Sequence, residues 1–165
     1  MSTLPNLPDA EQAYVRLRDQ LRDWCRPDVH LVGIYSGGVW LAERLHRDLN
    51  WPSPLGVISS TLHRDDFSER GLGHATQTQL PFEVQGAHIV LVDDVLYTGR
   101  TLRAVLNELY DFGRPARVQL AVLADRGGRE LPVCADVAAL TLDLPAQQTL
   151  SLQRDGELLR FSLEN

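Results

Sequence analysis

Short apolar segments alternate with amphipathic segments along most of this chain, and this alternation restricts its fold more than any other feature. The apolar segments predict strands at 29–34, 56–62, 88–92, 118–123 and 137–142. The amphipathic segments predict helices at 9–25, 39–49 and 101–112, with apolar residues spaced three and four apart. Strands that alternate with helices predict an α/β fold with a parallel sheet and right-handed crossovers.

The rest of the chain contains a long polar segment and a predicted hairpin. Residues 63–86 are polar and irregular, and a loop of this length in a compact domain usually has a function. Near the C-terminus, apolar residues alternate with polar ones on both sides of Asp155-Gly156, which is a hairpin turn signal. A chain of 165 residues with no internal repeat is expected to form one domain over residues 1–165.

Composition excludes several classes of protein. The sequence has 16 Arg and no Lys, so it contains neither a GxxxxGK[ST] phosphate loop nor a Schiff-base lysine. A net charge of −6 disfavours a protein that coats nucleic acid nonspecifically. The apolar runs fall far short of the ~20 residues of a membrane span, and no signal peptide is visible. We therefore expect a cytoplasmic protein without a membrane partner, in which Cys25 and Cys134 are buried free thiols.

The segment 88–106 carries the clearest chemical signal. An apolar strand leads to two adjacent carboxylates, Asp93 and Asp94, and then to Tyr97–Thr101 and a helix. Glycine and hydroxyl residues at a helix N-terminus favour a phosphate, because backbone N–H groups and the helix dipole both attract an anion. Acids just upstream suit a polyhydroxylated, metal-bound group such as ribose 5-phosphate. A solvated turn at Asp93-Asp94 and a simple helix cap at Thr98-Gly99 are the structural alternatives.

Four segments in order resemble one family. VLVDDVLYTGRT at 90–101 resembles the phosphoribosyl-pyrophosphate (PRPP) motif of type I phosphoribosyltransferases. Its VLYTGRT form is similar to the PyrR family, uracil phosphoribosyltransferases that also regulate pyrimidine genes. LVGIYSGGVWLAERL at 31–45, TLHRDD at 61–66 and GRPARVQLAVLADRGGRELP at 113–132 agree with that family, and the resemblance spans roughly residues 10–165.

The resemblance implies a fold, a reaction and partners. The fold is a parallel-sheet type I phosphoribosyltransferase fold with a long active-site loop and a small C-terminal hood or hairpin. The reaction converts uracil and PRPP to UMP and diphosphate, with Mg²⁺ bound together with PRPP. The implied partners are PRPP, uracil, UMP, a leader RNA of pyrimidine operons and further copies of the chain in a homodimer or larger homo-oligomer.

The resemblance also implies the site residues. Asp93 and Asp94 would bind the ribose hydroxyls directly or through Mg²⁺, and Arg64 on the long loop would stabilise the departing diphosphate. The segment 36–38 would hold the diphosphate, 97–101 the 5′-phosphate, and the residues after 124 would lie near the base. The predicted catalytic residues are Asp93, Asp94 and Arg64, and the predicted substrate-binding residues are Ser36, Gly37, Gly38, Val95, Leu96, Tyr97, Thr98, Gly99, Arg100, Thr101, Asp125, Arg126 and Arg129.

Three departures from the family pattern qualify this interpretation. Gly37 stands where the family usually has Arg, Gly128 stands where it has His, and no lysine supports an RNA surface. Two alternative functions therefore stay open. One is a nucleotide-sensing RNA-binding regulator with weak or no catalysis, and the other is a transferase for a different base.

Overall fold

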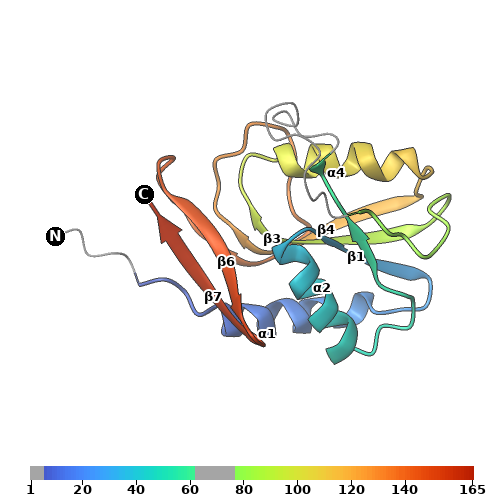
Figure 1. Ribbon diagram of the computed structural model, residues 1–165, viewed down its shortest axis with the longest axis horizontal. Helices are drawn as coiled ribbons and strands as arrows, with labels where there is room; N and C mark the ends of the chain where they lie inside the picture. Colours follow the sequence, from blue (N-terminus) through green and yellow to red (C-terminus); the bar gives the residue numbers. More distant parts are fainter. Residues whose placement is uncertain (1–5, 62–76) are drawn as a thin grey trace.

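The computed structural model describes residues 6–61 and 77–165. A central sheet lies between helices on its two faces, and a hairpin lies beside it (Figure 1). In chain order the elements are α1 (Ala10–Leu21), the short 3₁₀ helix η1 (Arg22–Trp24), β1 (Val29–Ile34), α2 (Gly37–Asp48), β2 (Gly56–Ile58), β3 (His88–Leu96), α4 (Arg100–Asp111), β4 (Arg117–Asp125), β5 (Val137–Thr141), β6 (Thr149–Asp155) and β7 (Leu158–Glu164).

The main sheet has five strands in the order β2-β1-β3-β4-β5, and every neighbouring pair is parallel. This confirms the α/β prediction. The strands β1 and β3 are neighbours in the middle, with Leu31 opposite Val90 and Gly33 opposite Val92. In open sheets of this kind, ligands bind beyond the carboxyl ends of the strands.

Two apolar cores fill the two faces of the sheet. Alternate residues of β3 point to opposite faces, so Val90 and Val92 pack with α1, α2 and the hairpin, whereas Ile89 and Leu91 pack with α4. All four side chains are fully buried. The helices α2 and α4 therefore lie on opposite faces of the sheet, as the ribbon also shows (Figure 1).

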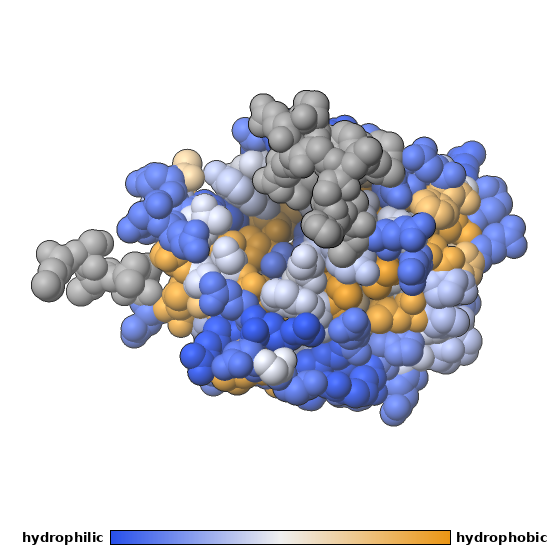
Figure 2. All heavy atoms as spheres, viewed as in Figure 1, coloured by the Kyte–Doolittle hydropathy of each residue, from blue (hydrophilic) through white to orange (hydrophobic). Residues whose placement is uncertain are grey.

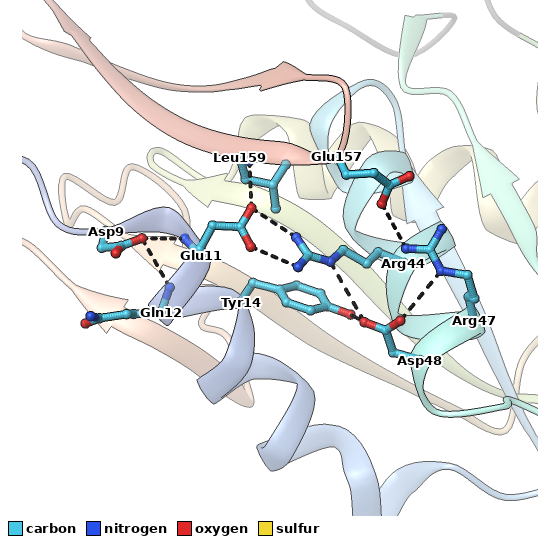
Figure 3. A network of polar contacts seen from close by, with 9 residues as sticks. All are labelled: Asp9, Glu11, Gln12, Tyr14, Arg44, Arg47, Asp48, Glu157 and Leu159. Atoms are coloured by element: carbon cyan, nitrogen blue, oxygen red, sulfur yellow. Dashed lines mark hydrogen bonds and ion pairs between the residues drawn. The ribbon is translucent and has the colours of Figure 1, made fainter.

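A network of polar contacts joins the hairpin to α1 and α2 (Figure 3). Glu11 accepts hydrogen bonds from both terminal nitrogens of Arg44, at 3.1 and 2.8 Å, and a third from the backbone N–H of Leu159 in β7, at 2.7 Å. The Arg44 guanidinium lies 4.0 Å above the Tyr14 ring, and the Tyr14 hydroxyl donates to Asp48 at 2.7 Å. Hydrophilic residues cover this edge of the molecule, as expected for the outer faces of α1 and α2 (Figure 2).

Several predicted element boundaries were wrong by a few residues. The helix predicted to reach Cys25 ends at Leu21 and continues as η1. β2 ends at Ile58, short of the predicted end at residue 62, and β3 continues past Val92 to Leu96. The hairpin turn is Gly156-Glu157, one residue later than predicted, because Asp155 pairs with Leu158.

Two other expectations concern burial and membranes. Cys25 is partly buried, but Cys134 is exposed in the loop before β5, so the expectation of two buried thiols was wrong for Cys134. Among the described helices, none combines the length and the hydropathy that a membrane crossing requires.

Candidate active site

Two adjoining cavities lie where β1 and β3 end. One has a volume of about 400 Å³ and lies at the start of α4, and the other has a volume of about 460 Å³ and lies between the start of α2 and the hairpin. Asp93, Val95, Tyr97 and Thr101 line both cavities. We therefore treat the two cavities as the two ends of one cleft.

The paired carboxylates Asp93 and Asp94 stand in the middle of this cleft. Asp93 is still opposite Val122 of β4, so the strand holds its backbone, and both aspartates are partly exposed. Oδ1 of Asp93 accepts from the Asp94 N–H, and Oδ1 of Asp94 accepts from the Val95 N–H, both at 2.8 Å. These short-range bonds fix the two carboxylates at the rim of the sheet without burying them.

The N-terminal ends of two helices, α2 and α4, lie at the cleft. Asp9 caps α1, because its Oδ1 accepts from the backbone N–H groups of Glu11 and Gln12 at 2.8 and 3.3 Å. By contrast, within the described residues, Ser36 at the N-cap of α2 makes no side-chain cap, and Gly99 at the N-cap of α4 has no side chain, so that only the first N–H of α4, that of Arg100, is bound by the neighbouring Thr98 hydroxyl. The other N-terminal N–H groups of the two helices are suited to an anion, so the cleft offers two anion sites on either side of the carboxylates.

The segment Ser36–Gly38 lies tightly against β3. A Cβ on Gly37 would lie 2.8 Å from Cγ of Asp94, and a Cβ on Gly38 would lie 3.1 Å from the Cα of Asp93. Neither position has space for a side chain, so the backbone of this segment approaches the carboxylates directly. The peptide bond between Tyr35 and Ser36 is cis. A side chain at position 37 would therefore have to displace the Asp94 carboxylate.

The segment Tyr97–Thr101 is held in a sharp turn before α4. Gly99 has φ 94°, and a Cβ there would also lie 2.5 Å from Cγ2 of Val133. Thr98 Oγ1 accepts a hydrogen bond from the backbone N–H of Arg100 at 3.2 Å. The Thr98 carbonyl accepts from the backbone N–H groups of Glu130 and Leu131. Glycine at position 99 thus meets both a conformational and a packing requirement of this turn.

Asp125 and Arg129 link the loop after β4 to the loop after β3. Arg129 donates to Asp125 Oδ2 and to the Tyr97 carbonyl, both at 2.6 Å, and to the Val133 carbonyl at 3.1 Å. Burial acts to raise the pKa of the Asp125 carboxyl. The hydrogen bonds from Arg129 and from the Gly127 N–H outweigh that effect, so this pKa is lower than its ordinary value.

The structure brings most of the predicted residues together at the cleft. Those that line the two cavities are Ser36, Gly37, Asp93, Asp94, Val95, Leu96, Tyr97, Thr98, Gly99, Arg100, Thr101 and Arg126. Gly38 packs against the backbone of Asp93, behind the lining residues. Asp125 and Arg129 bond to each other, and Arg129 also bonds to the Tyr97 carbonyl next to the cleft. Arg64 lies outside the described residues.

Sequence reasoning missed one wall of the second cavity. Tyr35 and Trp40, near the start of α2, and Ser60, after β2, line it together with Thr149–Leu152 of β6. The alternating pattern at 149–152 predicts a strand but does not indicate where the hairpin folds back. Only the packing of the hairpin on the main core places β6 at the cleft.

Comparisons with known proteins agree with this architecture. The sequence profile of the family described as "Phosphoribosyl transferase domain" matches residues 6–146. In structure, the chain is similar to an HGPRT-ase from Leishmania tarentolae in complex with GMP, with a TM-score of 0.60, 18% identity, and coverage of 86% of this chain and 82% of that one. It is also similar to a hypoxanthine-guanine phosphoribosyltransferase from Bacillus anthracis, with a TM-score of 0.62, 14% identity, and coverage of 84% and 85%. At these identities the likeness shows the fold.

Curated relatives identify the branch of the family. The chain is 47% identical over 159 residues to the bifunctional protein PyrR of Ralstonia nicotianae, which covers 90% of this chain and 88% of the relative. It is 50% identical over 137 residues to the bifunctional protein PyrR of Nitrosococcus oceani, which covers 81% and 77%. Together with the family profile and the cleft geometry, these matches show that the chain belongs to the PyrR family of phosphoribosyltransferases.

Proposed function

We propose that this cleft transfers the phosphoribosyl group of PRPP to uracil, giving UMP and diphosphate. One observation carries the proposal: two helix N-termini, neither of them capped by the side chain of its own N-cap residue, and one pair of carboxylates line the same cleft. PRPP has a phosphate at one end, a diphosphate at the other and two ribose hydroxyls between them. The order of groups in the cleft matches the order of groups in that molecule.

Each part of the cleft has a role in this reaction. The turn Tyr97–Thr101 holds the 5′-phosphate, the segment Ser36–Gly38 holds the diphosphate through backbone groups, and Asp93 and Asp94 hold the ribose hydroxyls. Arg64 is proposed to neutralise the departing diphosphate from the loop after β2. Val95 and Leu96 connect the two carboxylates to the phosphate turn. The part of the cleft near the base is formed by Asp125, Arg126 and Arg129.

The chemistry needs positioning more than it needs a nucleophile. The uracil N1 attacks C1′ of PRPP as the bond from C1′ to the diphosphate oxygen breaks, and the N1 proton leaves. Positive charge develops on the ribose ring as the diphosphate departs. The protein holds the two reactants in line and stabilises the separated charges, so no side chain has to form a covalent bond.

Mg²⁺ fits this donor set when PRPP brings it. Carboxylate oxygens are hard ligands of the kind that Mg²⁺ prefers, and Asp93 and Asp94 present two of them at an accessible strand end. Among residues 6–61 and 77–165, no cluster of three or more potential ligands could hold a metal ion by itself. Asp93 and Asp94 would therefore hold an ion whose other ligands are oxygens of PRPP and water, and that ion would neutralise charge on the diphosphate.

A PRPP-dependent assay with four bases tests the proposal. Uracil, hypoxanthine, guanine and orotate are each incubated with PRPP and Mg²⁺, and nucleotide formation is followed. We expect UMP from uracil and no nucleotide from the other three bases. Turnover of a purine would favour a transferase for another base, and no turnover at all would favour the nucleotide-sensing regulator.

Regulation of pyrimidine genes through RNA is the second proposed function. The curated relatives are named bifunctional proteins, and this is the observation that favours a second activity. We propose that a homodimer or larger homo-oligomer binds a leader RNA in response to UMP. With 16 Arg and no Lys, arginine has to make every cationic contact to the phosphates.

A further inference from the structure

Arg126 is a buried arginine whose donors are used by the protein itself. It directly follows β4 and is 3% exposed. One terminal nitrogen donates to the Gln148 carbonyl, and the other donates to the carbonyls of Pro145 and Leu144 at 3.0 and 3.4 Å. These carbonyls belong to the irregular segment 142–148, which leads directly into β6. The side chain therefore holds the entry to the hairpin.

The same guanidinium also holds Tyr97. Its Cζ lies 3.9 Å from the centre of the Tyr97 ring, within the range of a cation–π interaction. The backbone of Gly128 packs against the same ring, because a Cβ on Gly128 would lie 2.9 Å from Cδ2 of Tyr97. The backbone N–H of Arg126 also donates to the Leu96 carbonyl, at 3.1 Å. This bond fixes the backbone just before Tyr97.

The two groups that Arg126 connects are walls of the same cavity. Tyr97, the β6 residues Thr149–Leu152 and Arg126 itself line the space that also contains Asp93 and Asp94. The position of the Arg126 side chain thus sets the distance between the Tyr97 ring and the start of β6, which are two walls of this cavity. A planar guanidinium can stack on a ring and donate in its own plane at the same time, which a lysine ammonium cannot do.

Arg126 is buried at an energetic cost. Its Nε is buried and has no hydrogen-bond partner among the described residues, and such a donor costs about 1–3 kcal/mol. Within the described residues, the hydrogen-bond acceptors of its guanidinium are backbone carbonyl oxygens, which carry no full charge to balance it. A buried, incompletely satisfied polar group of this kind is a candidate for a functional role.

We propose that Arg126 is a positioning residue that sets the width of the base-binding part of the cleft by joining Tyr97 to the start of β6. It acts on the affinity for the base and leaves the PRPP contacts of Asp93, Asp94 and Thr98–Thr101 in place. This inference rests on the proposed phosphoribosyl transfer for its kinetic consequence, whereas its structural consequence can be measured without turnover.

The test compares Arg126→Gln with Arg44→Gln. Arg44 is a matched control, because its guanidinium also lies over a tyrosine ring, at 4.0 Å, and also holds the hairpin, but it does so through Glu11 and away from the cleft. We expect Arg126→Gln to raise KM for uracil about tenfold with KM for PRPP within about twofold of wild type. Arg44→Gln should lower the Tm and leave both KM values unchanged.

Hydrogen–deuterium exchange provides the readout that is independent of activity. In Arg126→Gln, the amides of residues 126–128 and 144–152 should exchange at least about fivefold faster, while the main sheet and the turn 98–101 keep their protection. Tyr97→Leu removes the stacking partner of Arg126 and should likewise raise KM for uracil and speed the exchange of residues 144–152. Because Tyr97 begins the phosphate turn, KM for PRPP is not a criterion for this variant. Arg126→Lys should give an intermediate change, and these two variants serve if Arg126→Gln does not fold.

Unchanged exchange in both segments, or an equal rise of both KM values, would overturn the role of Arg126. If the wild-type protein converts none of the four bases, the proposed function has failed and the exchange data alone decide the inference. Faster exchange confined to the two segments would then support it, and unchanged exchange would overturn it.

Discussion

Gly37 lies so close to Asp94 that a Cβ on the glycine would overlap the aspartate carboxylate, 2.8 Å from its Cγ. The backbone at the start of α2 and the acidic end of β3 are therefore in direct contact. A side chain at position 37 could enter only by displacing the Asp94 carboxylate. In the proposed reaction, the backbone N–H groups of this segment bind the diphosphate.

Gly37→Ala is expected to lower kcat/KM at least about tenfold, equivalent to about 1.4 kcal/mol, because the new methyl group displaces Asp94. Steady-state kinetics with PRPP and uracil measures the change. Gly156→Asn is the control, since Gly156 has φ 59°, which Asn tolerates, and a Cβ there meets no atom within 4 Å. Wild-type kinetics in Gly37→Ala would show that the segment can move away from Asp94.

Asp93→Asn combined with Asp94→Asn should abolish Mg²⁺-PRPP binding and leave the fold intact. Both carboxylates are partly exposed at the end of a strand, so their neutral amides can replace them without a packing defect. Calorimetric titration with PRPP measures the affinity, and far-UV circular dichroism checks the fold. The proposed role of the pair is lost if the double variant binds PRPP as the wild type does.

Removal of the hydroxyl in Thr101→Val should weaken UMP binding and leave uracil binding nearly unchanged, because Thr101 lines the cavity at the start of α4, where the 5′-phosphate is proposed to bind. Thr98→Ala should act in the same direction, and Gly99→Val should be the most damaging, since position 99 has φ 94° and faces Val133. Thr101→Ser restores the hydroxyl and should recover UMP binding. Equal losses for UMP and uracil would indicate a purely structural turn.

Glu11→Gln should destabilise the protein by about 1–2 kcal/mol at neutral pH, because it removes a charged acceptor from Arg44 and Leu159. The hydrogen bond from Arg44 holds the pKa of Glu11 below its ordinary value of 4.5, so its stabilising effect is present above pH 4.5 and is lost as the pH falls through the lowered value. Urea denaturation at pH 7 and pH 3 measures the difference between the two proteins. A difference that stays constant from pH 7 to pH 3 would contradict this assignment.

RNA binding should be weak at physiological salt and should depend steeply on salt concentration. The net charge of −6 repels RNA, so cationic contacts from arginine must supply the attraction. A filter-binding titration with the leader RNA of its own pyrimidine genes, with and without UMP, measures this across a salt series. Tight UMP-enhanced binding at ~150 mM salt with a shallow salt slope would instead indicate recognition through unpaired bases.

The sheet could be predicted from the sequence because its strands are short and apolar, and β1 was predicted with both ends correct. The ends of β2 and β3 depend on neighbours that no local pattern reveals. After Ile58, the Ser59 N–H donates to Thr78 Oγ1 and Ser59 Oγ accepts from Thr61, so side chains replace the strand ladder. β3 extends through its polar residues because β4 pairs with it as far as Asp125.

The site was predictable where one segment carries all of the chemistry and unpredictable where distant segments meet. Asp93, Asp94 and the turn that follows them are contiguous in sequence, and they line the cleft as a unit. The contacts of Arg129 with Tyr97 and Asp125, and the arrival of β6 at the cleft, join segments that lie far apart along the chain. Such contacts follow from tertiary packing and leave no periodic pattern in the sequence.

Because α2 and α4 lie on opposite faces of the sheet, a substrate bound between their N-termini would affect the stability of both layers. In the proposed binding mode, a molecule held at its diphosphate end by α2 and at its phosphate end by α4 would cross-link the two layers that pack on opposite faces of the sheet. Neither helix can then unfold without releasing the ligand, so the binding free energy stabilises both layers at once.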